Sequence, residues 1–483
     1  MRNNSLRTWR KPWTWSTRTW LIAITIATIA SPFLLRSLYL WQIPDVVLPF
    51  AIDDVIQPDV PDEENSFIAY ATVFERISNP KFNKPSATNT KIAVGDDLTI
   101  EELRGLISNY DEQALADYIR AGAMPLGGGP SLKTTTYWYN LTFQQYFRQL
   151  VRHFGPLAIS LEEGGEFEKS WACHRANLQA SIHVEQPPLL ISVLIGVAIR
   201  ITSANGMVHW ATNSSISSAQ LRSARFDLER EYARRAPHSA ALKAELIVVS
   251  NSMKDLQLLD YVLPNPSGIA ETDLIRNLKR VPLWITGQPE LSLRTYRQLL
   301  LNNLTEIDKP LNLRRPSTAY GGMLVFQLDP NIIRVPGQLS AERLEQIVRG
   351  NGPLELPMSR LSISLIPAIA NFDQAYQRDD ARYQCLRVIF AINEFQRNYG
   401  DFPEELGQLV PEVLDAIPID PMDPAGGLLR YRREDNGECT VWSVGPNGID
   451  DNAMLYAEEV LDIGFNAKLH GAEQSKAGSS PNP

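Results

Sequence analysis

Acidic residues are missing from the first part of this 483-residue chain. Residues 1–44 contain six basic residues and no aspartate or glutamate, whereas residues 45–483 carry 40 basic and 55 acidic residues. The net charge of −9 therefore combines a charge of +6 with one of −15. A basic segment without acids is typical of a terminus that inserts into a membrane. The acidic remainder excludes a nucleic-acid-binding body, because such a body presents a basic face.

Cysteine is also scarce, with three residues in the whole chain. Cys173, Cys385 and Cys439 are widely spaced, and their odd number does not form a disulfide framework. The sequence has no Cys-x-x-Cys pair and no clustered His and Cys ligands, so these residues do not indicate zinc. Cys385 falls at an apolar position of a helical pattern and Cys439 in an expected strand. We predict that both pack in the core.

Histidine is rare, and no pair of histidines has the i, i+4 spacing of a helical metal site. Four of the six fall in a region of helical pattern, where we expect structural or surface roles: His153, His174, His183 and His209. The HExxH and GxSxG signatures are absent as well. The glycine run 127–129 lacks the Lys-Ser/Thr pair of a phosphate-binding loop, so we interpret it as a flexible connection. The sequence thus assigns no catalytic or cofactor-binding residue.

A long hydrophobic run follows the basic residues of the N-terminus. Residues 19–35 are uncharged, and residues 38–41 extend the apolar stretch after Arg36. The positive-inside rule then predicts a cytoplasmic segment over 1–18, a transmembrane anchor over 19–41 and an extracytoplasmic body. This is the topology of a single-pass protein of the inner membrane, with its bulk in the periplasm. The alternative is a cleaved signal peptide with residues 20–30 as its apolar region.

The rest of the chain divides into a linker, a helical domain, a module and a tail. Residues 42–66, rich in Pro and Asp, are predicted to be a linker. Residues 67–380 are predicted to be a helix-rich domain of antiparallel hairpins without a regular repeat. Residues 188–201 are apolar on most faces, and we expect them to form the central buried helix. Other helices are expected near residue 63, over 99–123 with a Thr99/Glu102 capping box, over 167–183 and 218–248, within 270–310, and after an N-cap at Ser340.

The C-terminal module is predicted over residues 381–465, followed by a disordered tail over 466–483. Its first part is a helix with an apolar stripe, which Gly400 ends as a left-handed cap. Pro403 is suited to the first turn of a short second helix. Asp435-Asn436-Gly437 then lies between two apolar runs and predicts a β-hairpin. The predicted fold class is mainly α, with an N-terminal transmembrane helix, a helical-hairpin domain and a small α+β module.

The motifs of this module resemble the C-terminal domain of the type II secretion major pseudopilin over about residues 381–453. The matching pieces are Tyr399-Gly400, Phe402-Pro403, Asp420-Pro421, Arg430-Tyr431 and Trp442-Ser443-Val444-Gly445. The resemblance implies calcium binding by the final loop, with Asp450 and Asp451 as ligands and Asn452 and the carbonyl of Ser443 or Val444 as further candidates. Solvated acids in a turn are the alternative.

The N-terminus departs from the pseudopilin pattern. No Gly-Phe-Thr-Leu-Ile-Glu-like processing site precedes residues 19–35, and a large helical domain separates that segment from the module. The chain is therefore not expected to be a pilin subunit. As a whole it is similar to large membrane-anchored proteins of planctomycete-type bacteria in which a helical domain ends in this module.

Three functions are compatible with the sequence. The first is a non-enzymatic envelope scaffold or protein-interaction module, held by a single membrane anchor and contacting protein partners. The second is an extracytoplasmic hydrolase that uses clustered carboxylates, for which the candidates are Glu404, Asp415, Asp420 and Asp423. The third is an accessory component of a type II secretion or pilus-like system. We expect the first, because no catalytic constellation is present.

Overall fold

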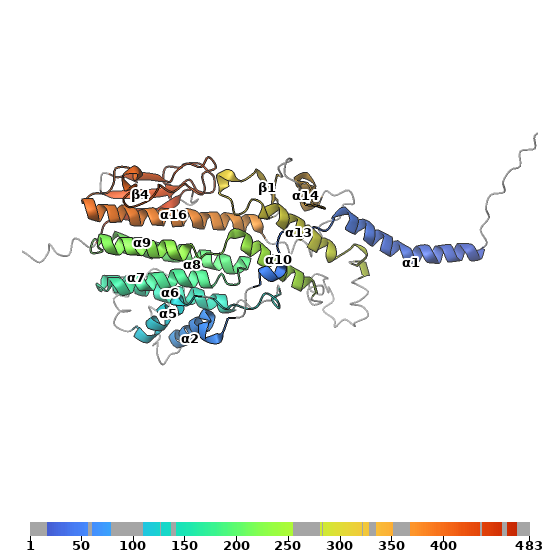
Figure 1. The fold of residues 1–483 in the computed structure, drawn as a ribbon, viewed down its shortest axis with the longest axis horizontal. Coiled ribbons are helices and arrows are strands. Elements are labelled where there is room, and N and C mark those ends of the chain that lie inside the picture. Colours follow the sequence, from blue (N-terminus) through green and yellow to red (C-terminus); the bar gives the residue numbers. More distant parts are fainter. Residues whose placement is uncertain are drawn as a thin grey trace, which may run out of the picture.

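The protein is mainly helical in the computed structural model, as the sequence predicts. The structure describes residues 17–56, 60–78, 110–125, 127–136, 142–254, 281–282, 284–320, 322–327, 335–350, 368–434, 437–455 and 461–470. An elongated body of helices lies at one end of the long axis, and a single apolar helix, α1, projects from the other (Figure 1).

The apolar helix α1 runs from Thr17 to Gln42 and confirms that an N-terminal helix is long and apolar enough to span a membrane. No residue of α1 is buried, and the body is contacted through the C-terminal half of the helix, where Phe33 and Arg36 meet Trp284. A second helix, α8 (Leu190–Thr212), passes the same test of length and composition. Most of its apolar window is buried, which confirms the prediction of a central core helix over 188–201.

Seven helices form the main bundle and run close to one another along the body (Figure 1). They are α2 (Ser66–Ser78), α5 (Glu112–Ala123), α6 (Thr142–Glu163), α7 (Phe167–His183), α8, α9 (Ser218–Tyr232) and α16 (Ile369–Tyr399). Aromatic rings fill the core between α2, α5 and α6, where Tyr118 stacks on Phe154 with ring centroids 4.2 Å apart. Rings of this size dominate core energetics because each buries a large apolar area.

A smaller unit lies between the bundle and α1. It contains α10 (His238–Lys254), α13 (Glu290–Leu304), β1 (Ser317–Tyr320), β2 (Met323–Phe326) and α14 (Ala341–Val348), with short 3-10 turns at Ile52–Asp54 and Leu311–Leu313; a third such turn, Asp62–Glu64, directly precedes α2. Strands β1 and β2 are antiparallel, and Asn302 of α13 pairs with both backbone groups of Phe326. The side chain of Ser340 accepts a hydrogen bond from Arg343 N, which confirms this residue as the N-cap of α14.

The C-terminal sheet is antiparallel in the order β3 (Arg430–Arg433), β4 (Glu438–Ser443) and β5 (Ile463–Lys468). The predicted hairpin is confirmed as the pair β3–β4, although residues 435–436 of its turn lie outside the described residues. Strand β5 was not predicted. It includes residues 466–468, so this part of the expected disordered tail is a paired strand, because its backbone completes the ladder with β4.

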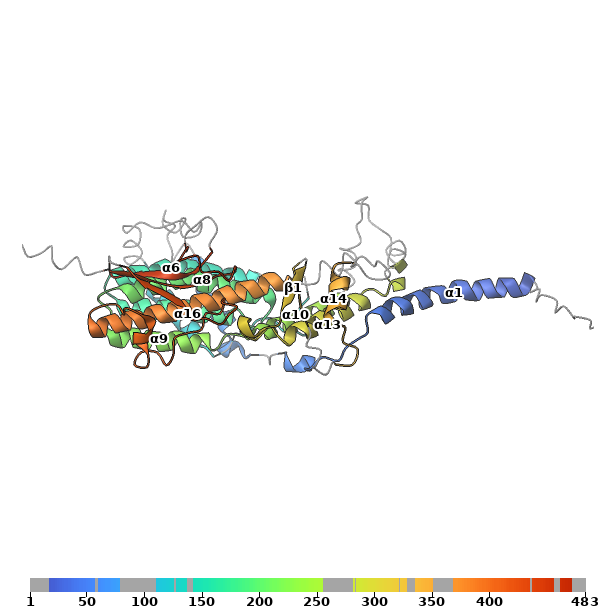
Figure 2. The ribbon, with the colours of Figure 1, turned by 90° about the horizontal axis from the view of Figure 1, so that it is seen from above.

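The module shares its core with the helical bundle. Helix α16 begins at Ile369, before the expected boundary at 380/381, and continues without a break to Tyr399. Gly400 follows at φ 91°, which confirms the left-handed cap. One apolar cluster joins residues of α8, α9, α16, β4 and β5, among them Trp210, Leu228, Phe390, Val441 and Phe465. Seen from above, the strands lie over α16 and α8 (Figure 2).

Other details differ from the sequence predictions. The helix expected over 99–123 begins at Glu112, because the carboxylate of Asp111 accepts a hydrogen bond from Ala114 N; Thr99 and Glu102 lie outside the described residues. The single helix expected over 218–248 is two helices: α9 ends at Tyr232, and α10 begins at His238. The short helix expected at Pro403 is a 3-10 turn at Leu406–Leu409, since the carbonyl of Pro403 accepts from the Tyr431 hydroxyl instead.

The glycine run is packed tightly and is not a flexible connection. Gly127 N donates to Gln186 Oε1 at 2.6 Å, and a Cβ at Gly129 would lie 2.3 Å from Gln186 O. Glycine is needed here because the backbones approach closely. The expected linker over 42–66 is also in contact with the body, where Ile43 and Val46 are buried.

Candidate functional site

The C-terminal loop positions its three predicted ligands by hydrogen bonds within the protein. Asp450 Oδ1 accepts from Trp442 Nε1 at 2.9 Å and from Asn452 N at 3.0 Å. Asp451 Oδ2 accepts from Asn447 Nδ2 at 2.6 Å, and the Asn452 side-chain oxygen accepts from Arg432 at 2.8 Å. Each side chain therefore faces a donor of the loop or of β3–β4. Calcium binding at Asp450, Asp451 and Asn452 stays a prediction.

A third carboxylate, Asp462, lies beneath this loop and was missed in the sequence. Its side chain is buried, and its oxygens accept from Asp451 N at 3.3 Å and Met454 N at 3.0 Å. Burial raises the pKa of Asp462, the two backbone bonds oppose this shift, and the nearby carboxylates of Asp451 and Asp450 add to it. No sequence motif marks Asp462, which reaches the loop because β5 pairs with β4.

The carboxylates considered for a hydrolase do not form a free acid–base pair. Asp420 and Asp423 both accept from Arg430, at 3.1 and 2.6 Å. Asp420 is buried and also accepts from Ser443 Oγ and Val444 N, so both of its oxygens are occupied. The arrangement holds the crossing loop against the sheet. Glu404 and Asp415 are exposed.

A buried charge network connects the centre of the bundle with α16. Arg200 of α8 lies 2.7 Å from Glu185 and 2.8 Å from Asp379, and Arg235 binds the same Asp379 oxygen at 3.0 Å. Burial raises the pKa of Glu185, and the charge of Arg200 opposes that shift. Tyr232 stacks on Tyr383 beside these groups, with ring centroids 3.7 Å apart. The charges compensate one another, which makes the network a structural element.

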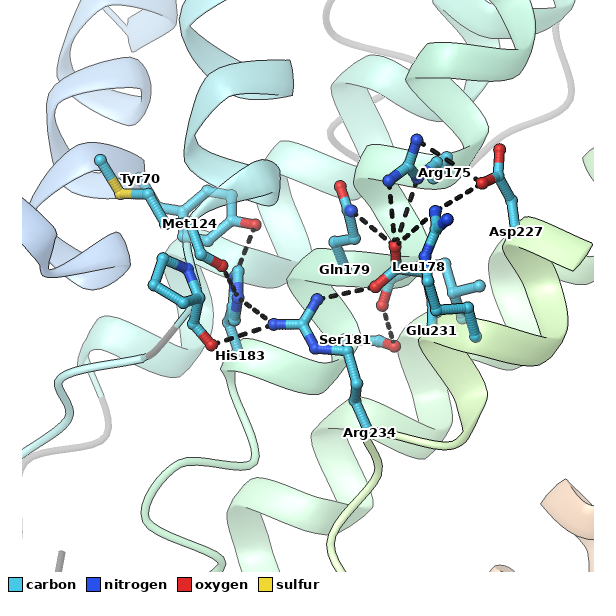
Figure 3. A network of polar contacts seen from close by, with 12 residues as sticks. Tyr70, Met124, Arg175, Leu178, Gln179, Ser181, His183, Asp227, Glu231 and Arg234 are labelled. Carbon is cyan, nitrogen blue, oxygen red and sulfur yellow. Dashed lines mark hydrogen bonds and ion pairs between the residues drawn. The ribbon is translucent and has the colours of Figure 1, made fainter.

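A second polar network joins α2, α7 and α9 around Glu231 (Figure 3). The carboxylate of Glu231 accepts from Arg175 at 3.2 Å, from Gln179 at 2.9 Å and from Arg234 at 2.7 Å. Arg234 also donates to the carbonyl of Pro125, which follows α5. Burial alone would raise the pKa of Glu231, but the hydrogen bonds from Arg234 and Gln179 lower it.

His183 belongs to the same network and is a structural histidine. Its Nδ1 lies 3.1 Å from the Tyr70 hydroxyl, and its Nε2 lies 3.0 Å from the carbonyl of Met124 (Figure 3). Burial and the charge of Arg234 lower the pKa of His183 to about 4, although the bond to Met124 opposes this shift. His183 is therefore neutral at pH 7 and bridges α2, α7 and the end of α5.

A cavity of about 230 Å³ lies between α6, α7 and α8. His174 and Asn177 line it from α7, and Ser203 and Gly206 from α8. Neither ring nitrogen of His174 has a hydrogen-bond partner among the described residues, and burial lowers the pKa of His174 to about 4. Gly206 has no side chain and therefore leaves room for the His174 ring, because a Cβ at this position would lie 2.6 Å from His174 Cε1.

The fourth histidine of the helical region, His209, meets Glu162 and His470 at the end of the bundle. Among the described residues, these three side chains form a group whose potential ligand atoms all lie within 4.8 Å of one another. Sequence reasoning missed it because no spacing signal connects residues so far apart in the chain.

Comparison of the chain with known protein families, with curated proteins and with solved structures finds no match. The fold and the side-chain geometry are therefore the basis for a functional conclusion.

Proposed function

We propose that this chain is a single-pass, membrane-anchored protein of the bacterial cell envelope that acts as a non-enzymatic scaffold and protein-interaction module. The supporting observation is the attachment of α1. Its apolar side chains are exposed along the helix, yet its C-terminal end is bound firmly to α13 of the body. Exposed apolar area of this extent is stable when lipid covers it.

The contacts at the C-terminal end of α1 would fix the orientation of the body relative to the membrane. Arg294 of α13 donates to the carbonyls of Leu40 and Ile43 at 3.3 and 3.4 Å. Arg297 binds both oxygens of Asp45 at 2.7 Å. The bond to Leu40 caps a carbonyl in the last turn of α1, where a basic side chain suits a helix C-terminus, and the other bonds hold the residues that follow. The helix is thereby joined to the body by directed contacts.

Trp284 supports the same arrangement from the body side. Arg36 of α1 donates to the Trp284 carbonyl at 2.6 Å, and Phe33 meets the indole ring edge-to-face with centroids 5.1 Å apart. Tryptophan is enriched at the depth of lipid headgroups. We propose that Trp284, together with Tyr39 and Trp41 of α1, marks the membrane surface from which the body extends.

The module offers apolar side chains to a protein partner. Ile419 and Leu428 face each other in an isolated antiparallel bridge and are 56% and 48% exposed. A protein partner could cover these two side chains, since apolar contacts form the core of protein interfaces. A scaffold that projects this module away from the membrane would bring it to a partner in the envelope.

Two measurements test the proposal. Alkaline phosphatase fused after residue 45 is expected to be active, whereas a reporter that is inactive in the periplasm is expected to be silent at the same position; the reverse pattern would overturn the orientation. A photo-crosslinking amino acid that replaces Leu428 is expected to give a defined protein adduct in living cells. The same crosslinking amino acid at the exposed position Glu404 is the matched control and is expected not to give this adduct. Equal labelling at both positions would contradict a specific partner surface.

A further inference from the structure

Three side chains from separate parts of the chain converge at the end of the bundle that carries the C-terminus of α16. Glu162 lies in the last turn of α6, His209 in the last turn of α8, and His470 directly after β5. His209 Nδ1 lies 3.0 Å from Glu162 Oε2, and His470 Nε2 lies 3.3 Å from Glu162 Oε1. The Glu162 side chain is inaccessible to solvent, whereas those of His209 and His470 are 37% and 31% exposed.

The hydrogen bonds of Thr212 favour a proton or a metal ion between His470 and Glu162. The Thr212 hydroxyl donates its hydrogen to the carbonyl of Val208 or His209, each 3.0 Å away. It therefore accepts from His470 Nδ1, which lies 3.4 Å away. A neutral His470 with its proton on Nδ1 presents a lone pair from Nε2 to the Glu162 carboxylate. Two acceptors then face each other unless a proton or a metal ion lies between them.

The geometry lets one ion meet all three groups. The rings of His209 and His470 have centroids 4.2 Å apart, and both rings reach the Glu162 carboxylate. One divalent cation between them would be bound by all three groups at once. The two Glu162–His distances of 3.0 and 3.3 Å are close to the separation of about 3.3 Å between ligand atoms that lie about 2.0–2.1 Å from a tetrahedral zinc ion, and all three ligand atoms lie within 4.8 Å of one another.

We propose that Glu162, His209 and His470 form a zinc site with one position open to solvent. Two imidazole nitrogens and one carboxylate oxygen are a typical three-ligand set for zinc. Calcium does not suit this set, since it takes six to eight oxygen ligands. The exposed edges of the two histidines provide the path for entry and the room for a bound water.

Two neighbouring residues act as the supporting groups that such a site requires. Asn213 Nδ2 donates to Glu162 Oε1 at 2.8 Å and orients the carboxylate. The Thr212 hydroxyl lies 3.4 Å from His470 Nδ1 and favours the tautomer that leaves Nε2 free to bind the ion. Outer contacts of this kind orient metal ligands and raise affinity. Thr212 is the last residue of α8 and Asn213 caps that helix, so these supporting groups closely follow the ligand His209 in the chain.

The ion would fasten the end of the sheet to the helical bundle. The backbone already holds His470 in place, because His470 N donates to Thr212 O at 3.3 Å and Ser214 N donates to His470 O at 2.9 Å. Asn213 and His470 form an isolated parallel bridge at the same place. Zinc would add ligand bonds from the segment after β5 to both α6 and α8, and would close the joint between module and bundle.

Titration of the purified full-length chain with zinc, in detergent and after treatment with a chelator, tests the site. We expect one zinc ion per chain and a higher melting temperature in zinc. Glu162→Gln and His470→Ala are each expected to weaken binding at least 10-fold. His153→Ala is the matched control and is expected to bind as the unchanged chain does. Cobalt(II) in place of zinc should give the visible absorption bands of a tetrahedral site.

Either of two outcomes would overturn the proposal. One is a stoichiometry well below one ion per chain, and the other is equal zinc affinity in the His470→Ala and unchanged chains. Circular dichroism of each variant before titration distinguishes loss of the site from loss of the fold. Glu162→Gln is useful here because it keeps the size of the buried side chain. The result is independent of the membrane topology and of any partner.

Discussion

Replacing Phe390 by alanine tests whether the module and the helical bundle form one cooperative unit. Phe390 is fully buried in α16 and meets the rings of Trp171 and Trp210, with centroids 5.5 and 6.2 Å away. These two tryptophans belong to α7 and α8, whereas the other face of α16 contacts β4 and β5. The ring is thus central to the apolar cluster that both parts share.

The expected loss in the free energy of unfolding is about 3–5 kcal/mol, the usual range for a buried phenylalanine that leaves a cavity. This is a large fraction of the roughly 5–15 kcal/mol that stabilises a domain. Urea unfolding of the full chain in detergent measures it, with tryptophan fluorescence and circular dichroism as separate probes. Both probes are expected to shift together, because one core unfolds. Phe226→Ala is the control, since Phe226 is 53% exposed and its loss should cost less than about 1 kcal/mol.

Two results would refute this reasoning. A loss below about 1 kcal/mol for Phe390→Ala would mean that the ring is not part of a close-packed core. Fluorescence and circular dichroism transitions that do not coincide would mean that the module and the bundle unfold separately. In that case the boundary expected at 380/381 would be a true domain boundary.

Three further predictions follow from the structure. The pKa of His183 is lowered to about 4, so between about pH 6.5 and 4 the unfolded state binds a proton that the folded state excludes, and the free energy of unfolding should fall by roughly 2–4 kcal/mol. Urea unfolding across this pH range should show a smaller loss for His183→Gln. Equal losses in the variant and the unchanged chain would contradict a buried, neutral His183. Gly129→Ala should lower the free energy of unfolding by about 1–3 kcal/mol in thermal unfolding, because the new Cβ would meet Gln186 O. At Gly155 of α6 a Cβ would have no atom within 4 Å, so Gly155→Ala should stabilise the helix by about 0.5–1 kcal/mol. Equal effects of the two substitutions would argue against close packing of the glycine run. Calcium added to the chelator-treated chain should raise the melting temperature and Asp451→Asn should abolish the rise; identical melting curves with and without calcium would remove the loop site.

Local signals in the sequence predicted the elements that depend on local physics. The apolar run of α8, the N-cap at Ser340 and the left-handed cap at Gly400 each follow from a residue and its near neighbours. The hairpin β3–β4 is of the same kind. The break between α9 and α10 was missed, although Pro237 lies directly before α10 and cannot continue a helix from α9.

Long-range pairing accounts for what the sequence could not predict. Strand β5 has no strong signal of its own, and it is a strand because β4 supplies its backbone partners. Asp462 and His470 therefore could not be placed near the loop or near Glu162 without knowledge of that pairing. Glu162 and His470 are 308 residues apart, and helical spacing rules report on neighbours three or four residues away.

Directed ion pairs explain how so long a helix as α16 keeps its register. Apolar packing alone is non-directional and tolerates small sliding movements between helices. Asp379 in the first half of α16 binds Arg200 of α8, and Glu394 near the end of α16 binds Arg222 and Arg225 of α9 at 2.6 and 3.3 Å. Breaking a buried pair of this kind costs about 3–5 kcal/mol, which penalises a shift of either end. The fixed register of α16 in turn holds the sheet, and with it His470, beside Glu162 and His209.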